Sequence, residues 1–408
     1  MGSGSRLASL AFFRGAGDSG LPRPDFHGTL VGRPPSRWTQ AFFGRRQGAL
    51  HYGLLPQLSR AAEWFLRSGI QETTGGVARY YRSDLKRNQP ISTEITGYAV
   101  SALVYLHFLL GDERHLVHAL AAARFLTGTA WDRTSQTMPF EMGPAAPAYF
   151  FDCGIVVRGL LSAWRASGEE EFLETAAALG RSMVRDFASS DGFHPILSLP
   201  DKGPLPRDPQ RWSRSPGCYQ LKSAMAWWDL AEATGDRAFR EPYERALTHA
   251  LQAWGVFLPG HPEKPKVMDR LHAFLYFLEG LLPRAGDPQC AAALCGGIRS
   301  VAQHLREIAP EFERSDVYAQ LLRIRLYAAW AGVSPLDREA AQFEAERLAG
   351  FQIPDSDPRV DGGFCFGRAG DTWSPHVSPV STAFALQALT LWDAFRAGGS
   401  AVERHLLI

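Results

Sequence analysis

Four acidic residues occupy positions from which a carboxyl group can do chemistry. Glu94, Asp152 and Asp269 fall at or near the start of three apolar stretches, and Glu141 lies in a loop between two pairs of apolar residues. Burial raises the pKa of a carboxyl group, which suits a general acid or base. The alternatives stay open, because a first-turn acid also caps its helix and a loop glutamate also forms salt bridges.

Aromatic residues gather in the same segments. Aromatic rings stack on the apolar faces of sugars, and a phenol relays protons where a nearby cation lowers its pKa. Core packing with a bonded hydroxyl is the competing interpretation. The candidate catalytic tyrosines are Tyr98, Tyr149 and Tyr219, and the candidate substrate-binding aromatics are Tyr80, Tyr81, Trp212, Phe364 and Trp373.

Arginines supply a means to bind a carboxylate. Arg79 lies in a glycine-rich loop and Arg270 adjoins Asp269. Either guanidinium can bind a carboxylate in bidentate fashion. An unpaired buried guanidinium is costly, so we expect Arg323 and Arg325 to pair with acids of the protein.

Histidines form the last group of candidates. His194 and His272 are expected to act as an acid, a base or a partner of a sugar hydroxyl, and His376 as a binding residue. The three are 78 and 104 residues apart, which matches no local metal-binding spacing. We therefore predict no metal and no cofactor.

The elements that position these residues are helices. Twelve helical patterns follow one another after residue 50, which gives six pairs. The expected helices span 56–69, 93–110, 113–128, 150–167, 169–188, 216–234, 237–257, 267–284, 287–309, 315–332, 336–352 and 377–396.

Short and long connections alternate between these helices. Gly111, Gly168 and Gly235 mark tight turns, as antiparallel helix hairpins require. Helices that follow a long connection are apolar on most faces, whereas their partners carry more charge. The sequence therefore predicts an all-α six-hairpin (α/α)6 toroid with an inner and an outer ring. The long connections, which show no pattern of regular structure, are 70–92, 129–149, 189–215, 258–266 and 353–376.

In such a toroid all long loops open where the inner helices begin. Helix N-termini are partly positive and carry free N–H groups, so six of them on one face favour an anionic or hydroxyl-rich ligand. Three acids directed at a common axis favour at least one functional carboxyl group. We expect residues 51–408 to form this single domain and residues 1–50, rich in Gly, Ser, Pro and Arg, to be a mobile arm.

Composition excludes several classes of function. The formal net charge is +1, from 43 basic and 42 acidic residues, so no strong field attracts nucleic acid or anionic lipid. Five scattered cysteines without a paired motif favour reduced thiols and a cytoplasmic setting. No stretch approaches the roughly 20 apolar residues of a transmembrane helix, and no signal peptide is expected.

Short motifs resemble known toroids. Segments 92–98, 151–154 and 271–274 resemble bacterial α/α-toroid proteins of polysaccharide-biosynthesis gene clusters. The Gly-Gly-Phe loop at 362–364 and the helix at 378–389 are similar to the repeat of terpenoid-cyclase and prenyltransferase toroids. The chain lacks the Asp-x-Asp-Asp motif and the zinc pattern of those two enzyme classes. A more distant likeness is to the catalytic domain of glucuronyl epimerases, which implies proton abstraction beside a uronic acid carboxylate.

The leading hypothesis is an enzyme that acts on an acidic or uronic-acid-containing glycan, free or lipid-linked, by epimerisation or lyase-type elimination. In it, Arg79 or Arg270 neutralises the carboxylate. A tyrosine or His272 exchanges the proton, and Glu94, Glu141 or Asp152 assists. The first alternative is a glycoside hydrolase that uses two carboxylates. The second is a non-catalytic glycan-binding toroid, in which no acid has a perturbed environment.

Overall fold

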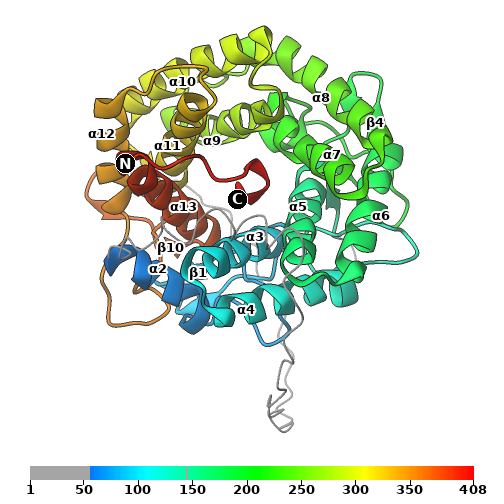
Figure 1. Cartoon of the computed structure of the whole chain (residues 1–408), viewed down its shortest axis with the longest axis horizontal. Coiled ribbons are helices and arrows are strands. Elements are labelled where there is room, and N and C mark those ends of the chain that lie inside the picture. The colour runs from blue at the N-terminus through cyan, green and yellow to red at the C-terminus, as the bar shows by residue number, and fades with distance from the viewer. Residues whose placement is uncertain (1–55, 144–145) are drawn as a thin grey trace, which may run out of the picture. The chain divides into compact units, whose positions relative to one another are not determined.

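Two concentric rings of helices make up the part of the protein that the computed structural model describes, residues 56–143 and 146–408 (Figure 1). The predicted toroid is thus confirmed, while the predicted arm at residues 1–50 lies outside the described residues. The inner helices are α3 (Thr93–Leu110), α5 (Phe150–Ser167), α7 (Leu221–Thr234), α9 (Lys264–Gly280), α11 (Ser315–Trp330) and α13 (Pro379–Arg396). The outer helices are α2 (Pro56–Arg67), α4 (Glu113–Arg124), α6 (Glu170–Asp186), α8 (Arg240–Ala253), α10 (Pro288–Ile308) and α12 (Arg338–Ala349).

The inner ring closes on itself. Each inner helix packs against the next, and α13 packs against α3, while the first outer helix, α2, packs against α13 and completes the sixth pair. The inner helices are buried on nearly all sides because their sequences are apolar all round. Helix α3 has the length and hydropathy of a membrane span, but it belongs to this ring and 67% of it is buried.

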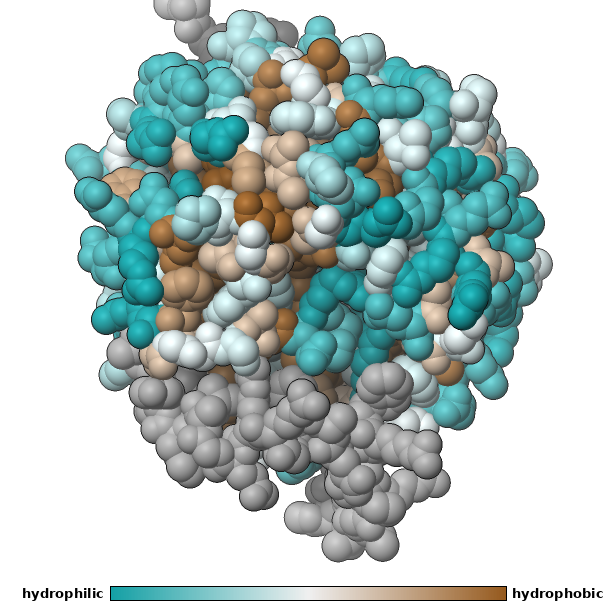
Figure 2. Space-filling view, turned by 45° about the horizontal axis from the view of Figure 1, so that its top comes forward, coloured by the Kyte–Doolittle hydropathy of each residue, from teal (hydrophilic) through white to brown (hydrophobic). Residues whose placement is uncertain are grey.

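Polar side chains cover much of the outside. In the view of Figure 2 hydrophilic residues flank a band of apolar ones on one face of the molecule. This agrees with the amphipathic patterns of the outer helices, which bury one face only.

Tight turns join each inner helix to the outer helix that follows it in the first three hairpins. Gly111, Gly168 and Gly235 end α3, α5 and α7 with φ between 67° and 75°, a left-handed conformation that glycine adopts without a steric penalty. Asp112 then caps α4 by accepting a hydrogen bond from the backbone of Arg114. The predicted punctuation is therefore confirmed at these turns.

The long connections differ from the prediction, because they contain short strands. Backbone groups in buried loops need partners, and antiparallel pairing between neighbouring loops supplies them. The pairs are β1 (Tyr81–Arg82) with β2 (Arg87–Asn88) and β10 (His376–Val377), β3 (Ala148–Tyr149) with β6 (Ile196–Leu197), β4 (Ala188–Ser189) with β5 (Gly192–Phe193), and β8 (Gly367–Ala369) with β7 (Glu313–Arg314) and β9 (Thr372–Trp373).

Further backbone hydrogen bonds tie the start of an inner helix to the loop that leads to the next one. Thr93 at the start of α3 donates to Phe140 (3.1 Å), and Ser315 at the start of α11 donates to Phe366 (3.0 Å). Phe150 at the start of α5 donates to Pro195 in the same way (2.9 Å). Because these loops contact one another, the N-termini of the inner helices lie on one face, which we call the loop face.

Glycines allow the inner helices to approach closely. A Cβ atom on Gly159 of α5 would lie 2.6 Å from the carbonyl oxygen of Gly97 on α3. One on Gly154 would lie 2.5 Å from the Cβ of Ser223 on α7. Both distances are far below van der Waals contact, so α5 fits between its neighbours only without these side chains.

Charged residues fill the inner ring farther from the loop face. Lys222 and Arg323 donate to the two oxygens of Glu279 (2.8 and 2.6 Å), and all three side chains are fully buried. The segment after α13 turns into the centre of the ring (Figure 1), where the Ile408 carbonyl accepts from both cations at 3.1 Å. Gln387 accepts from the Ile408 N–H and donates to the Leu406 carbonyl, so this segment covers the charged cluster.

We predict that Gly159→Ala destabilises the protein by about 2 kcal/mol, because overpacking a core contact costs roughly 1–3 kcal/mol. This loss outweighs the gain of about 1 kcal/mol that alanine brings to a helix interior. Urea unfolding measures the change. Gly128→Ala is the matched control, because nothing lies within 4 Å of a Cβ there. Equal stability of both variants would contradict the close helix contact.

Candidate functional site

Two carboxyl groups lie together at the loop face. Glu94 is in the first turn of α3, and Asp152 is in the first turn of the adjacent helix α5. Burial raises the pKa of Glu94 to about 7, with Arg79 opposing. Burial also raises the pKa of Asp152 well above its usual range, and the neighbouring Glu94 adds to the effect. At least one of the two carboxyl groups is therefore protonated near neutral pH.

Helix capping does not account for these two acids. The side chain of Ser92 caps α3, so Glu94 is free of that role. Asp152 is 5% exposed, and its Oδ2 atom makes no hydrogen bond to any described residue. A buried polar atom without a partner costs stability, which points to a ligand as the missing partner.

Arg79 and Glu141 complete this group, which we call the acid side. They form an ion pair with each other, and the guanidinium of Arg79 also lies 4.6 Å from the ring centroid of Phe140. A backbone bridge between Ser92 and Glu141 holds the glutamate beside the start of α3. The salt-bridge interpretation of Glu141 thus agrees with the structure, and Arg79 is bound by the protein itself.

Across the ring, His272 on α9 forms a second group, the histidine side. Its Nδ1 atom lies 2.6 Å from Oε1 of Gln320 and 3.5 Å from Oδ2 of Asp316, both on α11. The pKa of His272 is lowered, chiefly because the side chain is buried, so its ring is neutral. Because the amide oxygen accepts a proton from Nδ1, the lone pair lies on Nε2.

A chain of ion pairs holds Asp316 in place beside His272. Arg314 donates to both oxygens of Asp316 (3.0 and 2.6 Å) and to Asp269 (2.6 Å). Trp212 donates to the other oxygen of Asp269 at 2.5 Å. Asp269 therefore links the loop before α7 to the starts of α9 and α11. Arg314, Asp316 and Gln320 could not be predicted as site residues from the sequence, because their roles depend on contacts between separate helices.

Aromatic rings occupy the space between the two sides. Phe384 of α13 contacts Tyr98 (5.3 Å between centroids) and Tyr276 (6.5 Å), and Phe151 contacts Tyr276 at 4.6 Å. The ring of His272 lies 4.5 Å from that of Tyr276. We call Tyr98, Phe151, Tyr276 and Phe384 the aromatic cluster. Burial raises the pKa of both tyrosines, and Glu94 raises them further, which places the acid near both hydroxyls.

Tyr149 and Arg214 stand at the edge of the acid side. Burial and Asp152 raise the pKa of Tyr149, while a hydrogen bond to Arg214 opposes the rise. Arg214 lies in the 3₁₀ turn Trp212–Arg214, is partly exposed, and forms no ion pair with any acid in the described part of the chain. Sequence reasoning missed this arginine, because its loop has no periodic pattern.

Several predicted site residues have other contacts. The guanidinium of Arg270 donates twice to the Phe257 carbonyl (3.0 and 2.7 Å), so it is not available as a carboxylate clamp. Phe364 is fully buried, and Tyr81, 1% exposed, donates its hydroxyl to Asp357. These three positions are corrections, because packing into the protein removes their side chains from a substrate.

The remaining candidates lie in the loops. The Tyr219 hydroxyl donates to the Ser215 carbonyl (3.0 Å). Tyr80 lies 4.6 Å from His376, centroid to centroid. Trp373 lies on β9, is 36% exposed and packs against Phe351. His194 lies between β5 and β6 and is half-buried. No described contact joins His194 or Trp373 to the acid side. Within residues 56–143 and 146–408, no three His, Cys, Asp or Glu side chains are grouped to hold a metal ion.

Solved structures share this fold at low sequence identity. A sugar epimerase from a ruminal bacterium has a TM-score of 0.64 and 12% identity over 82% of this chain and 98% of that one. D-mannose isomerase has a TM-score of 0.62 and 8% identity over 89% and 100%. A family 76 α-mannanase from Bacteroides thetaiotaomicron has a TM-score of 0.56 and 10% identity over 83% and 97%.

Neither a protein-family model nor a curated protein matches the sequence. At these identities the solved structures establish the α/α-toroid fold and leave the chemistry to the residues of this chain.

Because the pKa of Glu94 is raised, the contribution of this side chain to stability should depend on pH. A carboxyl group whose folded-state pKa is raised stabilises fully below its unfolded value, 4.5, and loses that contribution as the pH rises through about 7. Glu94→Gln stays neutral at every pH. We predict that it is more stable than wild type by about 2 kcal/mol at pH 8, and that most of this gain disappears at pH 5.

Urea unfolding at both pH values measures this difference. Glu174→Gln, at an exposed position on α6, is the control for removal of an acid. A gain for Glu94→Gln that is the same at pH 5 and pH 8 would show that Glu94 does not hold its proton in the folded protein.

Proposed function

We propose that this protein is a carbohydrate-active enzyme that transfers a proton beside the carboxylate of a uronic acid in a glycan, as an epimerase or a lyase does. The observation that carries the proposal is the presence of an acid and a base on opposite sides of the aromatic cluster. Glu94 and Asp152 hold a proton on one side, and neutral His272 offers a lone pair on the other.

This arrangement suits inversion of a carbon atom. One group removes the proton from one face of the sugar ring, and the other returns a proton to the opposite face. The C–H bond breaks with its electron pair left on the carbon next to the carboxylate, and a new C–H bond forms there. For elimination, the protonated acid would instead donate to the leaving glycosidic oxygen. The pKa of Glu94, about 7, suits either step.

Arg214 supports an acidic substrate. It is the partly buried guanidinium beside Tyr149 that lacks an acidic partner in the described part of the chain. Arg79 and Arg270 are bound by Glu141 and by the Phe257 carbonyl. A substrate carboxylate would give Arg214 a charge-assisted partner. As the neighbouring proton is removed, the carboxylate takes up additional negative charge, which the guanidinium would stabilise.

The fold is consistent with a sugar substrate. A sugar epimerase and a sugar isomerase share the toroid. The raised pKa of both acids favours an enzyme over a non-catalytic binding protein.

Glycoside hydrolysis is the second candidate function, because Glu94 and Asp152 form a carboxyl pair in which one member keeps its proton. In this case Asp152 and Glu94 divide the roles of acid and nucleophile or base, and His272 has no part in bond breaking. The family 76 α-mannanase has the same fold.

Incubation with a panel of uronic-acid polymers in heavy water separates these reactions. We expect deuterium at the ring carbon that bears the carboxylate, or a new ultraviolet-absorbing double bond if the outcome is elimination. New reducing ends without either signal would favour hydrolysis. Loss of every signal across the panel would contradict the proposed function.

We predict that Arg214→Gln lowers kcat/KM on the acidic substrate by about 100-fold, since a hydrogen bond to a charged group contributes roughly 1.5–3 kcal/mol. Arg214→Lys should restore part of the loss. Arg211→Gln is the control on the same loop, because Arg211 is 70% exposed and pairs weakly with Asp208 at 3.7 Å. Equal effects of the Arg211 and Arg214 changes would remove the carboxylate contact.

Single changes at the acid and the base should separate the two half-reactions. We predict that Glu94→Gln and His272→Gln each lower epimerisation by at least about 100-fold. Each variant should still exchange the proton of one of the two epimers with heavy water, because the opposite group is intact. Mass spectrometry and NMR measure the exchange, with His304→Gln on α10 as control. A decrease below tenfold for His272→Gln, with hydrolysis retained, would favour the carboxyl-pair mechanism.

A further inference from the structure

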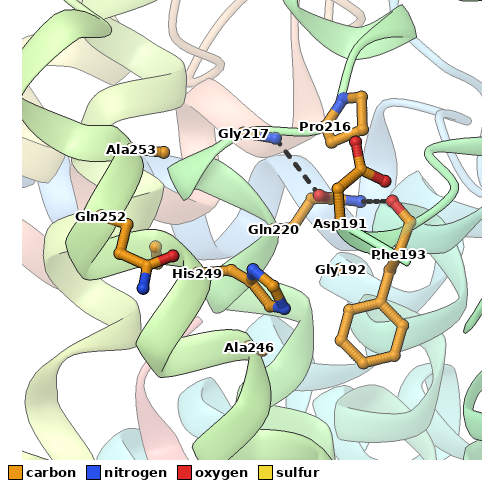
Figure 3. Close-up of a pocket in the computed structure, with 11 residues that line it drawn as sticks. Asp191, Gly192, Phe193, Pro216, Gly217, Gln220, Ala246, His249, Gln252 and Ala253 are labelled. Carbon is orange, nitrogen blue, oxygen red and sulfur yellow. Dashed lines mark hydrogen bonds between the residues drawn. The ribbon is translucent and has the colours of Figure 1, made fainter. Parts of the chain in front are cut away.

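A cavity lies at the loop face, outside the site described above. Its volume is about 280 Å³, and it lies between the C-terminal half of α8, the β5 strand and the segment 216–220 that leads into α7 (Figure 3). Pockets for drug-sized ligands span roughly 300–1,000 Å³, so this one suits a single small ring. The residues that contribute polar side chains to it are Asp191, Gln220, His249 and Gln252.

These polar side chains have unused hydrogen-bonding capacity. His249 and Gln252 make no hydrogen bond to another residue of the described chain, and Figure 3 shows both on the α8 wall, opposite Asp191 and Pro216. Gln220 accepts from the Gly217 N–H (3.2 Å) and donates to the Phe193 carbonyl (3.0 Å), which leaves it one lone pair and one N–H. The amides and the imidazole thus offer both donors and acceptors.

The charged side chains around the cavity favour a neutral ligand. The single acid of the cavity, Asp191, is held by Arg207 in a two-point contact (2.7 and 2.8 Å) and accepts from Ser189 (3.0 Å), and these contacts lower its pKa. No cation lines the cavity, and the nearby Arg207 is already paired with Asp191, so no free positive charge is available to an anionic ligand. Vicinal hydroxyl groups of a neutral sugar match the available donors and acceptors.

The cavity and the candidate site share a wall. Segment 212–217 carries Trp212 and Arg214 towards the acid and histidine sides, and its end, Pro216 and Gly217, lines the cavity. The Tyr219 hydroxyl bonds the Ser215 carbonyl and fixes this segment against α7. Arg214 and Pro216, which lines the cavity, are two residues apart on this segment, so a glycan bound at Arg214 would have only this segment to cross.

We propose that this cavity is an outer subsite that binds one neutral sugar residue of the same glycan whose uronic acid occupies the candidate site. The inference rests on the proposed function for the identity of the glycan, but its binding test does not. The substrate would accordingly be a mixed polymer of acidic and neutral sugars rather than a homopolymer of uronic acid.

Saturation-transfer NMR with neutral methyl glycosides of glucose, galactose and mannose tests the subsite directly. We expect the wild-type protein to bind at least one of them. His249→Ala removes a polar partner, and Ala253→Phe fills the cavity from the last turn of α8. Each should weaken binding of that glycoside at least tenfold. Thr248→Ala, at an exposed position of α8 that does not line the cavity, should leave binding unchanged.

Arg214→Gln separates the two sites. It should leave the binding of neutral glycosides unchanged, although it abolishes most turnover of acidic polymers. Binding that disappears in Arg214→Gln and persists in Ala253→Phe would place the neutral sugar in the candidate site and overturn the subsite, as would the absence of any glycoside binding. If neutral glycosides bind as expected while no acidic polymer turns over, the proposed function fails and the cavity remains a sugar site.

Discussion

The hydrogen bonds that tie the starts of α3, α5 and α11 to neighbouring loops are the constraint on which the rest of this structure depends. Thr93 bonds Phe140, Phe150 bonds Pro195, and Ser315 bonds Phe366. Each bond satisfies a first-turn N–H group that a helix cannot satisfy internally. Together they hold the N-termini on one face, and without them the acids and histidines that begin or follow these turns would not meet.

The candidate site has a stability cost that the surrounding packing offsets. Glu94 and Asp152 are buried together, and Asp152 lacks a partner at one oxygen. Such groups persist only where a large apolar core overdetermines the fold. The close contact of α5 with α3 through Gly97 and Gly159 supplies part of that core. Farther from the loop face, Lys222, Glu279 and Arg323 neutralise one another, so the charge there is structural.

The two sides of the site differ in how their protons are controlled. On the acid side, burial keeps a proton bound, and the neighbouring Glu94 adds to this effect at Asp152. On the histidine side, burial keeps a proton away, and Gln320 holds the tautomer. Burial alone would raise the pKa of Asp316, but Arg314 lowers it below its usual range, so this carboxylate stays ionised and does not donate a proton to the ring. At one pH, the acid side therefore keeps a proton on a carboxyl group while the ring of His272 stays neutral.

Much of the fold follows from local patterns in the sequence. All-round apolar helices alternate with amphipathic ones, and Gly111, Gly168 and Gly235 end helices by local conformational preference, so the toroid and most of its turns could be predicted. The strand pairs between different loops could not be predicted, since they join segments far apart in the chain, such as Tyr81 with Val377. The start of α7 at Leu221, after a 3₁₀ turn, likewise depends on contacts of Gln220 with Phe193.

For the site, the sequence by itself determined which acids and histidines begin or lie within the inner helices, among them Glu94, Asp152 and His272. Only the tertiary structure decided which partner each side chain has. In the folded protein Arg79 pairs with Glu141, and Arg270 donates to the Phe257 carbonyl. Arg214 has no acidic partner in the described chain. The physical reason is that helix position depends on local periodicity, whereas pKa and pairing depend on burial and charge contributed by helices distant in sequence.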